Sequence, residues 1–303
     1  MSSFDYTSLW ERPPVIEEII LKQKENSLIQ IDILRLDLIH PMLSGNKIFK
    51  LSLFLSDCLQ SNHRTLLTFG GALSNHLSAT AYACRTLGIK CIGLVRGEIL
   101  NSPTLKYCQK MGMELHGMER SEFRKISEQT NNDLLISKYG PHTLVPLGGF
   151  GKKGAKGAMD IMNLVPENTY SHICTPVGSG TTLAGLLLKS RKETIVAFPA
   201  IKNMYDIPKR MLEMGVRSLD KLSVVSNYHF GGFAKRNDEL IKFINQFYRD
   251  YQIPLDMVYT SKMLFGVIDM IQKGEFPRSS KILCIHTGGL QGNQSLPAGT
   301  LCF

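Results

Sequence analysis

The sequence contains no apolar run that approaches the roughly 18 residues needed by a membrane-spanning helix. Its first residues also lack the basic segment, followed by an apolar one, that is typical of a secretion signal, so we expect a cytoplasmic protein. With 43% hydrophobic and 20% charged residues, the composition excludes disordered, collagen-like and low-complexity proteins. At roughly 150 residues per domain, a chain of 303 residues predicts two domains or one large α/β domain.

No two cysteines have the Cys-x-x-Cys spacing that is typical of zinc and redox sites. The number of cysteines is odd, and most of them stand in apolar runs, as Cys91 and Cys284 do. We therefore expect buried, reduced thiols, without disulfides and without a metal site. The cysteines are Cys58, Cys84, Cys91, Cys108, Cys174, Cys284 and Cys302.

Acidic residues are fewer than basic ones, which gives a formal net charge of +9. Such a balance admits nucleic acid, an anionic membrane or a phosphate-bearing ligand as a partner. Because the basic residues are scattered among acidic ones and form no cluster with aromatic residues, we expect neither nucleic acid nor a membrane as a partner. Nucleic-acid binding is the alternative that charge alone suggests, and it predicts salt-dependent association with DNA or RNA.

Short apolar runs alternate along the chain with longer segments whose patterns suit helices. Each run is almost continuously apolar, which is typical of strands buried on both faces of a parallel sheet. This alternation predicts a doubly wound α/β architecture. The expected strands are 65–69, 91–95, 172–177, 194–198 and 281–285, and the expected helices include 74–87, 181–192 and 237–251.

Glycine-rich loops follow three of these strands, at the edge where α/β sheets bind ligands. The loop Gly178-Ser179-Gly180-Thr181-Thr182 combines hydroxyl groups with backbone N–H groups at a helix start, which suits a phosphate. It is not a dinucleotide fingerprint, because position 183 is leucine. A Walker A loop is also excluded, because Gly151-Lys152 is followed by Lys153. A tight turn without a ligand explains the loop equally well.

Two lysines begin a helical pattern in the segment Ser44-Gly45-Asn46-Lys47-Ile48-Phe49-Lys50-Leu51. Because Lys47 and Lys50 are three residues apart, we expect both on one helical face. The helix dipole and the second ammonium would lower the pKa of Lys47. A neutral lysine can form a Schiff base with a carbonyl group and can then act as a base. The alternative is that both are ordinary surface lysines.

Five motifs resemble, in the same order, those of the 1-aminocyclopropane-1-carboxylate deaminase/D-cysteine desulfhydrase family of pyridoxal-phosphate enzymes. They extend from about position 35 to position 292, and their order is far more specific than any single motif. Arg35-Leu36-Asp37 is a weakened form of the basic-basic-acidic approach to the family's lysine. The motifs are residues 44–51, Gly70-Gly71-Ala72-Leu73-Ser74-Asn75-His76, residues 177–182, Val258-Tyr259-Thr260-Ser261-Lys262 and His286-Thr287-Gly288-Gly289.

The resemblance implies the tryptophan-synthase β-like (fold type II) fold of pyridoxal-phosphate enzymes, an α/β fold with mainly parallel sheets. We expect a large cofactor-binding α/β domain at residues 1–50 and 153–303, and a small inserted α/β domain at residues 51–152. The chain would cross between them near Lys50 and in the Gly- and Lys-rich stretch 148–157. Pyridoxal 5′-phosphate would lie in the cleft between the domains, and family members commonly pair as homodimers.

The resemblance also implies roles for single residues. Lys47 matches the lysine that forms the Schiff base and moves the proton at Cα of the substrate, and Lys50 matches a lysine near the phosphate. Asn75 matches the asparagine that binds the 3′-oxygen of the pyridine ring, and Ser74 matches a serine close to the substrate carboxylate. Residues 178–182 match the phosphate loop.

Tyr259 matches a tyrosine on the substrate side of the ring, and Thr260 matches the position at the pyridine nitrogen. A hydroxyl group there leaves the nitrogen largely unprotonated, which suits β-elimination. These residues also have structural interpretations: Ser74 and Asn75 as caps of the following helix, and Tyr259 and Thr260 as the end of a strand and the cap of the next helix. We assign no catalytic role to His76.

The chain departs from the family at three positions. Phe233 stands where the deaminases have a second active-site tyrosine, Thr260 where they have glutamate, and Phe49 where the family has arginine. Because a phenyl ring cannot exchange the proton of a phenol, ring opening of the cyclopropane substrate is not expected.

We therefore predict a pyridoxal-phosphate-dependent lyase that acts on a small amino acid by β-elimination. It would be most like D-cysteine desulfhydrase, which releases pyruvate, ammonia and sulfide. One alternative is another enzyme of the same kind, a 1-aminocyclopropane-1-carboxylate deaminase or a different D-amino acid lyase. The other is a catalytically idle homologue that only binds the cofactor.

Overall fold

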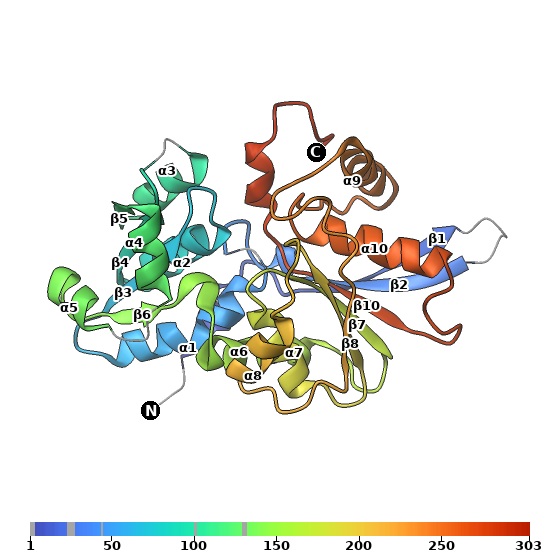
Figure 1. The fold of residues 1–303 in the computed structure, drawn as a ribbon, viewed down its shortest axis with the longest axis horizontal. Helices are drawn as coiled ribbons and strands as arrows, with labels where there is room; N and C mark the ends of the chain where they lie inside the picture. Colours follow the sequence, from blue (N-terminus) through green and yellow to red (C-terminus); the bar gives the residue numbers. More distant parts are fainter. Residues whose placement is uncertain (1–3, 23–27, 44, 100–101, 129–131) are drawn as a thin grey trace.

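The computed structural model describes residues 4–22, 28–43, 45–99, 102–128 and 132–303, so Ser44 of the first motif lies outside the described residues. The strands form two sheets that lie side by side in Figure 1. The strands are β1 (Ile16–Lys22), β2 (Leu28–Arg35), β3 (Thr65–Gly70), β4 (Lys90–Arg96), β5 (Met113–Met118), β6 (Thr143–Val145), β7 (His172–Val177), β8 (Thr194–Pro199), β9 (Leu222–Val224) and β10 (Ile282–His286).

The larger sheet has the strand order β1-β2-β10-β7-β8-β9. Its pairs are parallel except β1 with β2, which are antiparallel. The prediction of β7, β8 and β10 is confirmed, at nearly the observed bounds. The β1–β2 pair was not predicted, because polar residues interrupt both strands. Asp32 of β2, for example, accepts a hydrogen bond of 2.6 Å from the Tyr170 hydroxyl.

The smaller sheet has the order β5-β4-β3-β6, and all its pairs are parallel. The predicted strands β3 and β4 form its centre. The edge strands were not predicted, since β5 carries exposed polar residues and β6 is only three residues long. In this sheet, continuous apolar runs thus identify the central strands and miss the edge strands, which have one side open to water.

Helices cover both faces of the larger sheet, as expected of a doubly wound fold. Ile173 and Leu283 pack on the face covered by α7 (Thr181–Lys189), whereas the neighbouring Cys174 and Cys284 pack on the face covered by α10 (Thr260–Gln272). The helices are α1 (Lys47–Gln60), α2 (Asn75–Thr86), α3 (Pro103–Lys110), α4 (Arg120–Ser127), α5 (Asp133–Tyr139), α6 (Lys152–Ala158), α7 (Thr181–Lys189), α8 (Ile207–Glu213), α9 (Asp238–Tyr251) and α10 (Thr260–Gln272).

The predicted helices α2, α7 and α9 are confirmed, but α7 ends before position 192. The carboxylate of Glu193 accepts hydrogen bonds from the backbone N–H groups of Arg191 (2.7 Å) and Lys192 (3.1 Å). Local side-chain bonds of this kind compete with the helix for backbone groups. The helix consequently ends at Lys189.

One hydrophobic cluster extends across both sheets and includes Leu66 of β3, Ile173 of β7 and Phe49 of α1. Phe49 is fully buried, and its ring lies 5.6 Å from that of Tyr6 and 6.1 Å from that of Trp10. The phenylalanine that we expect to replace the family's arginine therefore has apolar surroundings. Packing in the core is therefore the physical reason for a phenylalanine at this position.

The stretch 148–157 contains a helix, α6, that packs against α1 and α7 through glycines. A Cβ on Gly157 would lie 2.2 Å from the carbonyl oxygen of Phe49, and one on Gly185 would lie 2.6 Å from Cβ of Ala158. These glycines allow the helices to approach closely. The domain boundaries near Lys50 and within 148–157 stay predictions.

In the described part of the chain, no helix is both long and apolar enough to cross a membrane. All cysteines are free thiols, and every one except Cys302 is buried.

We expect Gly157→Ala to lower the free energy of unfolding by roughly 1–3 kcal/mol, because the new Cβ would overlap the Phe49 carbonyl. Gly71→Ala is the matched control, since nothing lies within 4 Å of a Cβ at that position. Urea unfolding of both variants and the parent measures the difference. Equal stability of the two variants would show that α6 does not pack this closely against α1.

Candidate active site

Helix α1 begins at Lys47, after a loop that contacts the residues following β10. Position 45 requires glycine, because its φ is +68° and a Cβ would lie 2.0 Å from the carbonyl oxygen of Thr287. The N–H group of Asn46 donates a hydrogen bond of 3.3 Å to the same oxygen. This contact brings the first and the last predicted motifs together.

The side chain of Asn46 links the amine of Lys47 to the phosphate loop, residues 178–182. Lys47 Nζ donates to Asn46 Oδ1 (2.6 Å), and Asn46 Nδ2 donates to Thr182 Oγ1 (2.7 Å). Burial lowers the pKa of Lys47 to about 8, and the charge of Asp256 opposes this shift. The predicted lowering of the pKa is confirmed, but its cause is burial rather than the charge of Lys50 that we expected. Asn46 was not predicted as a site residue, although it directly precedes Lys47.

Lys50 lies one turn further along α1, on the same side as Lys47. Its Nζ donates a hydrogen bond of 2.8 Å to the carbonyl oxygen of Gly148. Burial, together with the charge of Lys47, holds the pKa of Lys50 well below its ordinary value. The Gly148 carbonyl is neutral and uses only one of the three N–H donors that an ammonium group has, so two donors remain for a ligand. Two adjacent buried amines suit an anionic ligand.

The phosphate loop connects β7 to the start of α7. Gly180 precedes α7 with a φ of +89°, and the hydroxyl groups of Ser179 and Thr181 lie 3.0 Å apart. Arg210 of α8 donates to the carbonyl oxygen of Ser179 (3.5 Å), and its guanidinium lies over the ring of Phe150. Hydroxyl groups, backbone N–H groups at a helix start and a nearby guanidinium form a donor set for phosphate. Sequence reasoning did not find Arg210.

Ser74 and Asn75 begin α2, at the carboxyl end of β3. Ser74 Oγ accepts a hydrogen bond from the N–H of Leu77 (3.2 Å), so its structural role as a helix cap is confirmed. Asn75 Nδ2 donates to the carbonyl oxygen of Gly289 (3.2 Å), which lies beyond β10. Asn75 therefore connects the smaller sheet to the loop that contacts Gly45.

Tyr259 and Thr260 stand at the start of α10, around the buried carboxylate of Asp256. Asp256 accepts hydrogen bonds from the N–H groups of Val258, Tyr259 and Thr260, and from the Thr260 hydroxyl (2.6 Å). Both residues stand at a helix start, as expected, but among the described residues no strand directly precedes them and the Tyr259 side chain makes no cap, so that part of the structural interpretation is wrong. The carboxylate of Asp256 binds the N–H groups there instead. Burial, with the charge of Asp256, raises the pKa of Tyr259. Asp256 was not predicted, because its contacts are made only when the turn folds.

Tyr259 connects the phosphate loop to Phe233. A Cβ on Gly178 would lie 3.0 Å from the tyrosine ring and 3.1 Å from its hydroxyl oxygen. On another side, the ring of Phe233 lies 6.0 Å from that of Tyr259, at an angle of 66°. Phe233 remains 54% exposed, so this aromatic pair lies at the surface end of the site.

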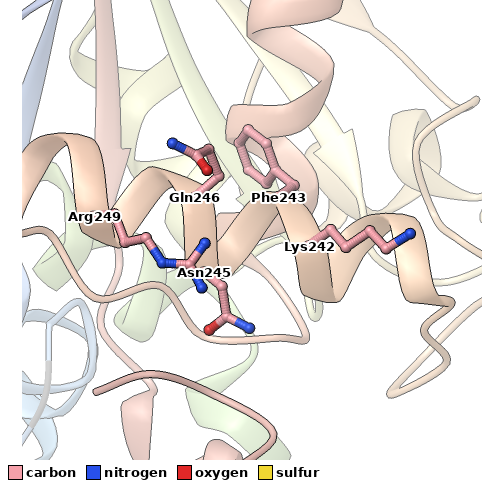
Figure 2. Close-up of a pocket in the computed structure, with 5 residues that line it drawn as sticks. All are labelled: Lys242, Phe243, Asn245, Gln246 and Arg249. Atoms are coloured by element: carbon pink, nitrogen blue, oxygen red, sulfur yellow. The ribbon is translucent and has the colours of Figure 1, made fainter.

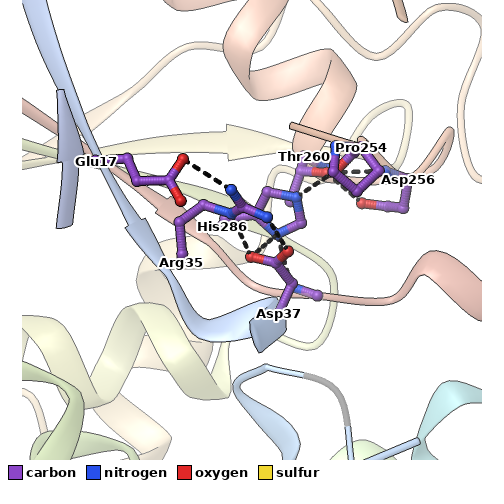
Figure 3. A network of polar contacts seen from close by, with 8 residues as sticks. Glu17, Arg35, Asp37, Pro254, Asp256, Thr260 and His286 are labelled. Atoms are coloured by element: carbon purple, nitrogen blue, oxygen red, sulfur yellow. Dashed lines mark hydrogen bonds and ion pairs between the residues drawn. The ribbon is translucent and has the colours of Figure 1, made fainter. Parts of the chain in front are cut away.

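A buried ionic network fixes the ends of β2 and β10 beneath these residues, as Figure 3 shows. Arg35 donates two hydrogen bonds to Asp37 (2.9 and 2.7 Å) and a third to Glu17 (2.9 Å). Asp37 also lies 3.2 Å from Nδ1 of His286, whose Nε2 donates to the Pro254 carbonyl (2.8 Å). Burial alone would raise the pKa of Asp37, but His286 and Arg35 hold it below its ordinary value.

The assembled residues fit a small ligand that carries a phosphate and a carbonyl group. Lys47 offers an amine of lowered pKa, and Lys50 and the phosphate loop offer donors for an anion. The buried Oδ1 of Asn75 has no hydrogen-bond partner among the described residues. Because buried polar atoms are rarely unpaired, this acceptor indicates that a hydrogen-bond donor, from a ligand or from water, completes the site.

A separate surface pocket lies on α9 and is shown in Figure 2. Asn245 there donates to the Thr300 carbonyl and accepts from the N–H of Cys302, so the C-terminal residues are fixed to this helix. None of the predicted site residues lines the pocket. Its lining residues are Lys242, Phe243, Asn245, Gln246 and Arg249.

We expect Asp37→Asn to lower the free energy of unfolding at neutral pH by roughly 3–5 kcal/mol, because the buried Arg35 guanidinium would lose its two-pronged partner. In the folded protein the pKa of Asp37 lies below 3.8, so its stabilisation is present above that pH. It is lost as the pH falls through the lowered pKa.

The parent should consequently lose more stability than Asp37→Asn between about pH 5 and about pH 2. Denaturant unfolding across this range measures the two slopes. Parallel slopes would contradict a lowered pKa for this carboxyl group.

Comparison with known proteins places these motifs in a family. A sequence profile described as "Pyridoxal-phosphate dependent enzyme" matches residues 30–288. A protein of Pyrococcus abyssi, provisionally named 1-aminocyclopropane-1-carboxylate deaminase, is 30% identical over 287 residues, which cover 87% of this chain and 86% of that protein. The bifunctional D-cysteine desulfhydrase/1-aminocyclopropane-1-carboxylate deaminase of Arabidopsis thaliana is 28% identical, with 82% of this chain and 70% of that protein covered.

Solved structures agree with the fold. The crystal structure of an ACC deaminase homologue has a TM-score of 0.77 at 26% identity and covers 94% of this chain and 92% of that one. The predicted fold type II architecture, the pyridoxal-phosphate cofactor and the lyase or deaminase class are thereby confirmed. The chain belongs to the pyridoxal-phosphate-dependent enzymes, within the 1-aminocyclopropane-1-carboxylate deaminase/D-cysteine desulfhydrase family.

Proposed function

We propose that this enzyme eliminates the β-substituent of a small amino acid and that its substrate is D-cysteine. The observation that carries the proposal is the chemistry around Tyr259. The aromatic side chain in contact with it, Phe233, has no hydroxyl group, and the neighbouring Thr260 carries no charge. Elimination of a thiol needs a base at Cα, whereas the deaminases place a second tyrosine and a glutamate at these two positions.

Lys47 is the residue that would hold the cofactor and move the proton at Cα. When bound, pyridoxal phosphate supplies a carbonyl carbon for an amine and a ring that accepts the electron pair left at Cα. With a pKa of about 8, Lys47 is partly neutral near neutral pH and can act as nucleophile and as base. The hydrogen bond to Asn46 orients its amine.

Residues on both sides would hold the phosphate and the ring. Lys50 and the phosphate loop bind the phosphate, with Arg210 adding positive charge behind Ser179. Asn75 uses one N–H for the Gly289 carbonyl, so its second N–H can bind the ring oxygen.

The start of α2 would bind the substrate. Its free N–H groups, next to Ser74, favour the substrate carboxylate. Thr260 would face the ring nitrogen as a neutral group, because its hydroxyl proton is donated to Asp256. Without a charged group or a free proton at this position, the nitrogen is left largely unprotonated, which suits β-elimination.

The names of the relatives support two candidate substrates. The Arabidopsis relative is named for both D-cysteine desulfhydration and 1-aminocyclopropane-1-carboxylate deamination, and the Pyrococcus relative for the second alone. Deamination of the cyclopropane amino acid is therefore the second candidate. Phe233 and Thr260 favour the first.

We expect the rate at which cofactor-free protein forms its coloured adduct with pyridoxal phosphate to rise with pH through about 8, because only the neutral amine of Lys47 attacks the carbonyl. Stopped-flow absorbance at a series of pH values measures this rate. Lys47→Ala should stay colourless, whereas Lys153→Ala, which changes an exposed lysine of α6, should keep the colour. A coloured Lys47→Ala protein would refute the assignment.

We expect the purified enzyme to convert D-cysteine to sulfide and pyruvate and to form no 2-oxobutanoate from 1-aminocyclopropane-1-carboxylate. Parallel assays of the three products, with L-cysteine as the mirror-image control, measure this. Formation of 2-oxobutanoate without sulfide would establish the deaminase instead. A coloured protein that turns over none of the three would be the idle homologue.

A further inference from the structure

Lys262 is a buried lysine for which the proposed reaction has no use. It lies in the first turn of α10 and is only 2% exposed. Its Nζ donates hydrogen bonds to two backbone carbonyls, those of His229 (2.9 Å) and Gly232 (2.8 Å). Burying an ammonium group against neutral partners is costly compared with burying an apolar side chain of the same length. A lysine buried in this way indicates that its hydrogen bonds hold the backbone in a particular conformation.

The two carbonyls belong to consecutive turns of the segment 228–235. The N–H of Gly232 donates to the His229 carbonyl (3.0 Å), and the N–H of Lys235 donates to the Gly232 carbonyl (3.1 Å). Lys262 therefore donates to the carbonyl group that accepts the hydrogen bond of each turn. Phe233 lies within the second turn. The segment is strained at Phe230 and Ala234, which have positive φ without being glycine. Strained backbone of this kind persists only when surrounding contacts hold it.

Tyr228 and Phe230 pack against the body of α10, whereas Phe233 lies at its start, beside Tyr259. Tyr228 donates a hydrogen bond to Asp269 (2.6 Å), and the ring of Phe230 lies 5.0 Å from that of Phe265. Phe233 instead extends toward Tyr259, with half of its surface open to solvent. The position of Phe233 thus depends on the backbone of its own turn, which Lys262 binds.

We propose that Lys262 is a positioning residue that holds the segment 228–235 so that Phe233 forms an apolar wall beside Tyr259, and that this wall selects amino acids with a compact, uncharged side chain. The proposal rests on the proposed function in placing the substrate beside Tyr259. A charged side chain would lose water against a phenyl ring without gaining a partner, whereas a thiol or methyl group loses little. The two hydrogen bonds need two N–H donors, which a lysine has in both protonation states.

The test compares Lys262→Met with Lys235→Met, which removes one exposed positive charge from the same segment. In the cofactor-free proteins, we expect amide hydrogen exchange across 228–235 to become at least about tenfold faster in Lys262→Met and to stay unchanged in Lys235→Met. In the cofactor-loaded proteins, spectral titration with D-alanine and D-aspartate measures side-chain preference. The parent and Lys235→Met should prefer D-alanine, and Lys262→Met should lose this preference while keeping its colour.

Phe233→Ala and the double variant show whether Lys262 acts through the ring. Phe233→Ala should lose the same preference, and adding Lys262→Met should change it no further. Should Lys262→Met fail to fold, Lys262→Gln, which keeps an amide donor, and Phe233→Ala carry the same comparison.

Unchanged exchange, or additive effects of the two substitutions, would overturn the proposal. A protein that stays colourless with pyridoxal phosphate would refute the proposed function instead. Because hydrogen exchange is measured without cofactor, the two failures are distinguishable.

Discussion

The close contact between Gly45 and Thr287 is the constraint on which the candidate site depends. Only a residue without Cβ permits it, since a Cβ at position 45 would overlap the Thr287 carbonyl. The contact places the start of α1, and with it Lys47, against the residues that follow β10. Asn75 reaches the same residues from the smaller sheet by its hydrogen bond to Gly289. Residues connected to both sheets therefore come together at the candidate site.

The burial of two neighbouring lysines, Lys47 and Lys50, determines the chemistry of the candidate site. Lys47 and Lys50 lie one turn apart, and the charge of the first lowers the pKa of the second. The buried carboxylate that opposes the shift at Lys47, that of Asp256, already accepts hydrogen bonds from the start of α10. An anionic ligand would relieve this excess of buried positive charge. The net charge of +9 is thus less informative than these two amines.

The two phenylalanines at which we expect the chain to depart from its family, Phe49 and Phe233, have different surroundings. Phe49 is fully buried among Tyr6 and Trp10, where an arginine would have no place, so the substitution is explained by packing. Phe233 is half exposed and contacts Tyr259, where, under the proposed function, it would face the substrate without a hydroxyl group. The first residue contributes to packing of the core, and the second would act on specificity under the proposed function.

The sequence by itself determined the central strands β3, β4, β7, β8 and β10, the glycine-rich loops and the order of the motifs, because these depend on local composition. Tertiary structure alone decided the antiparallel β1–β2 pair, the link from Lys47 through Asn46 to Thr182, and the network of Asp37 with His286.

It also decided which charged groups are buried. The pKa of Lys47 follows from burial by distant segments, and Lys262 gains its task only where the carbonyls of the segment 228–235 approach it. The physical reason is that hydrogen-bond partners and burial come from residues far apart in the chain, and no local pattern records which of them will meet.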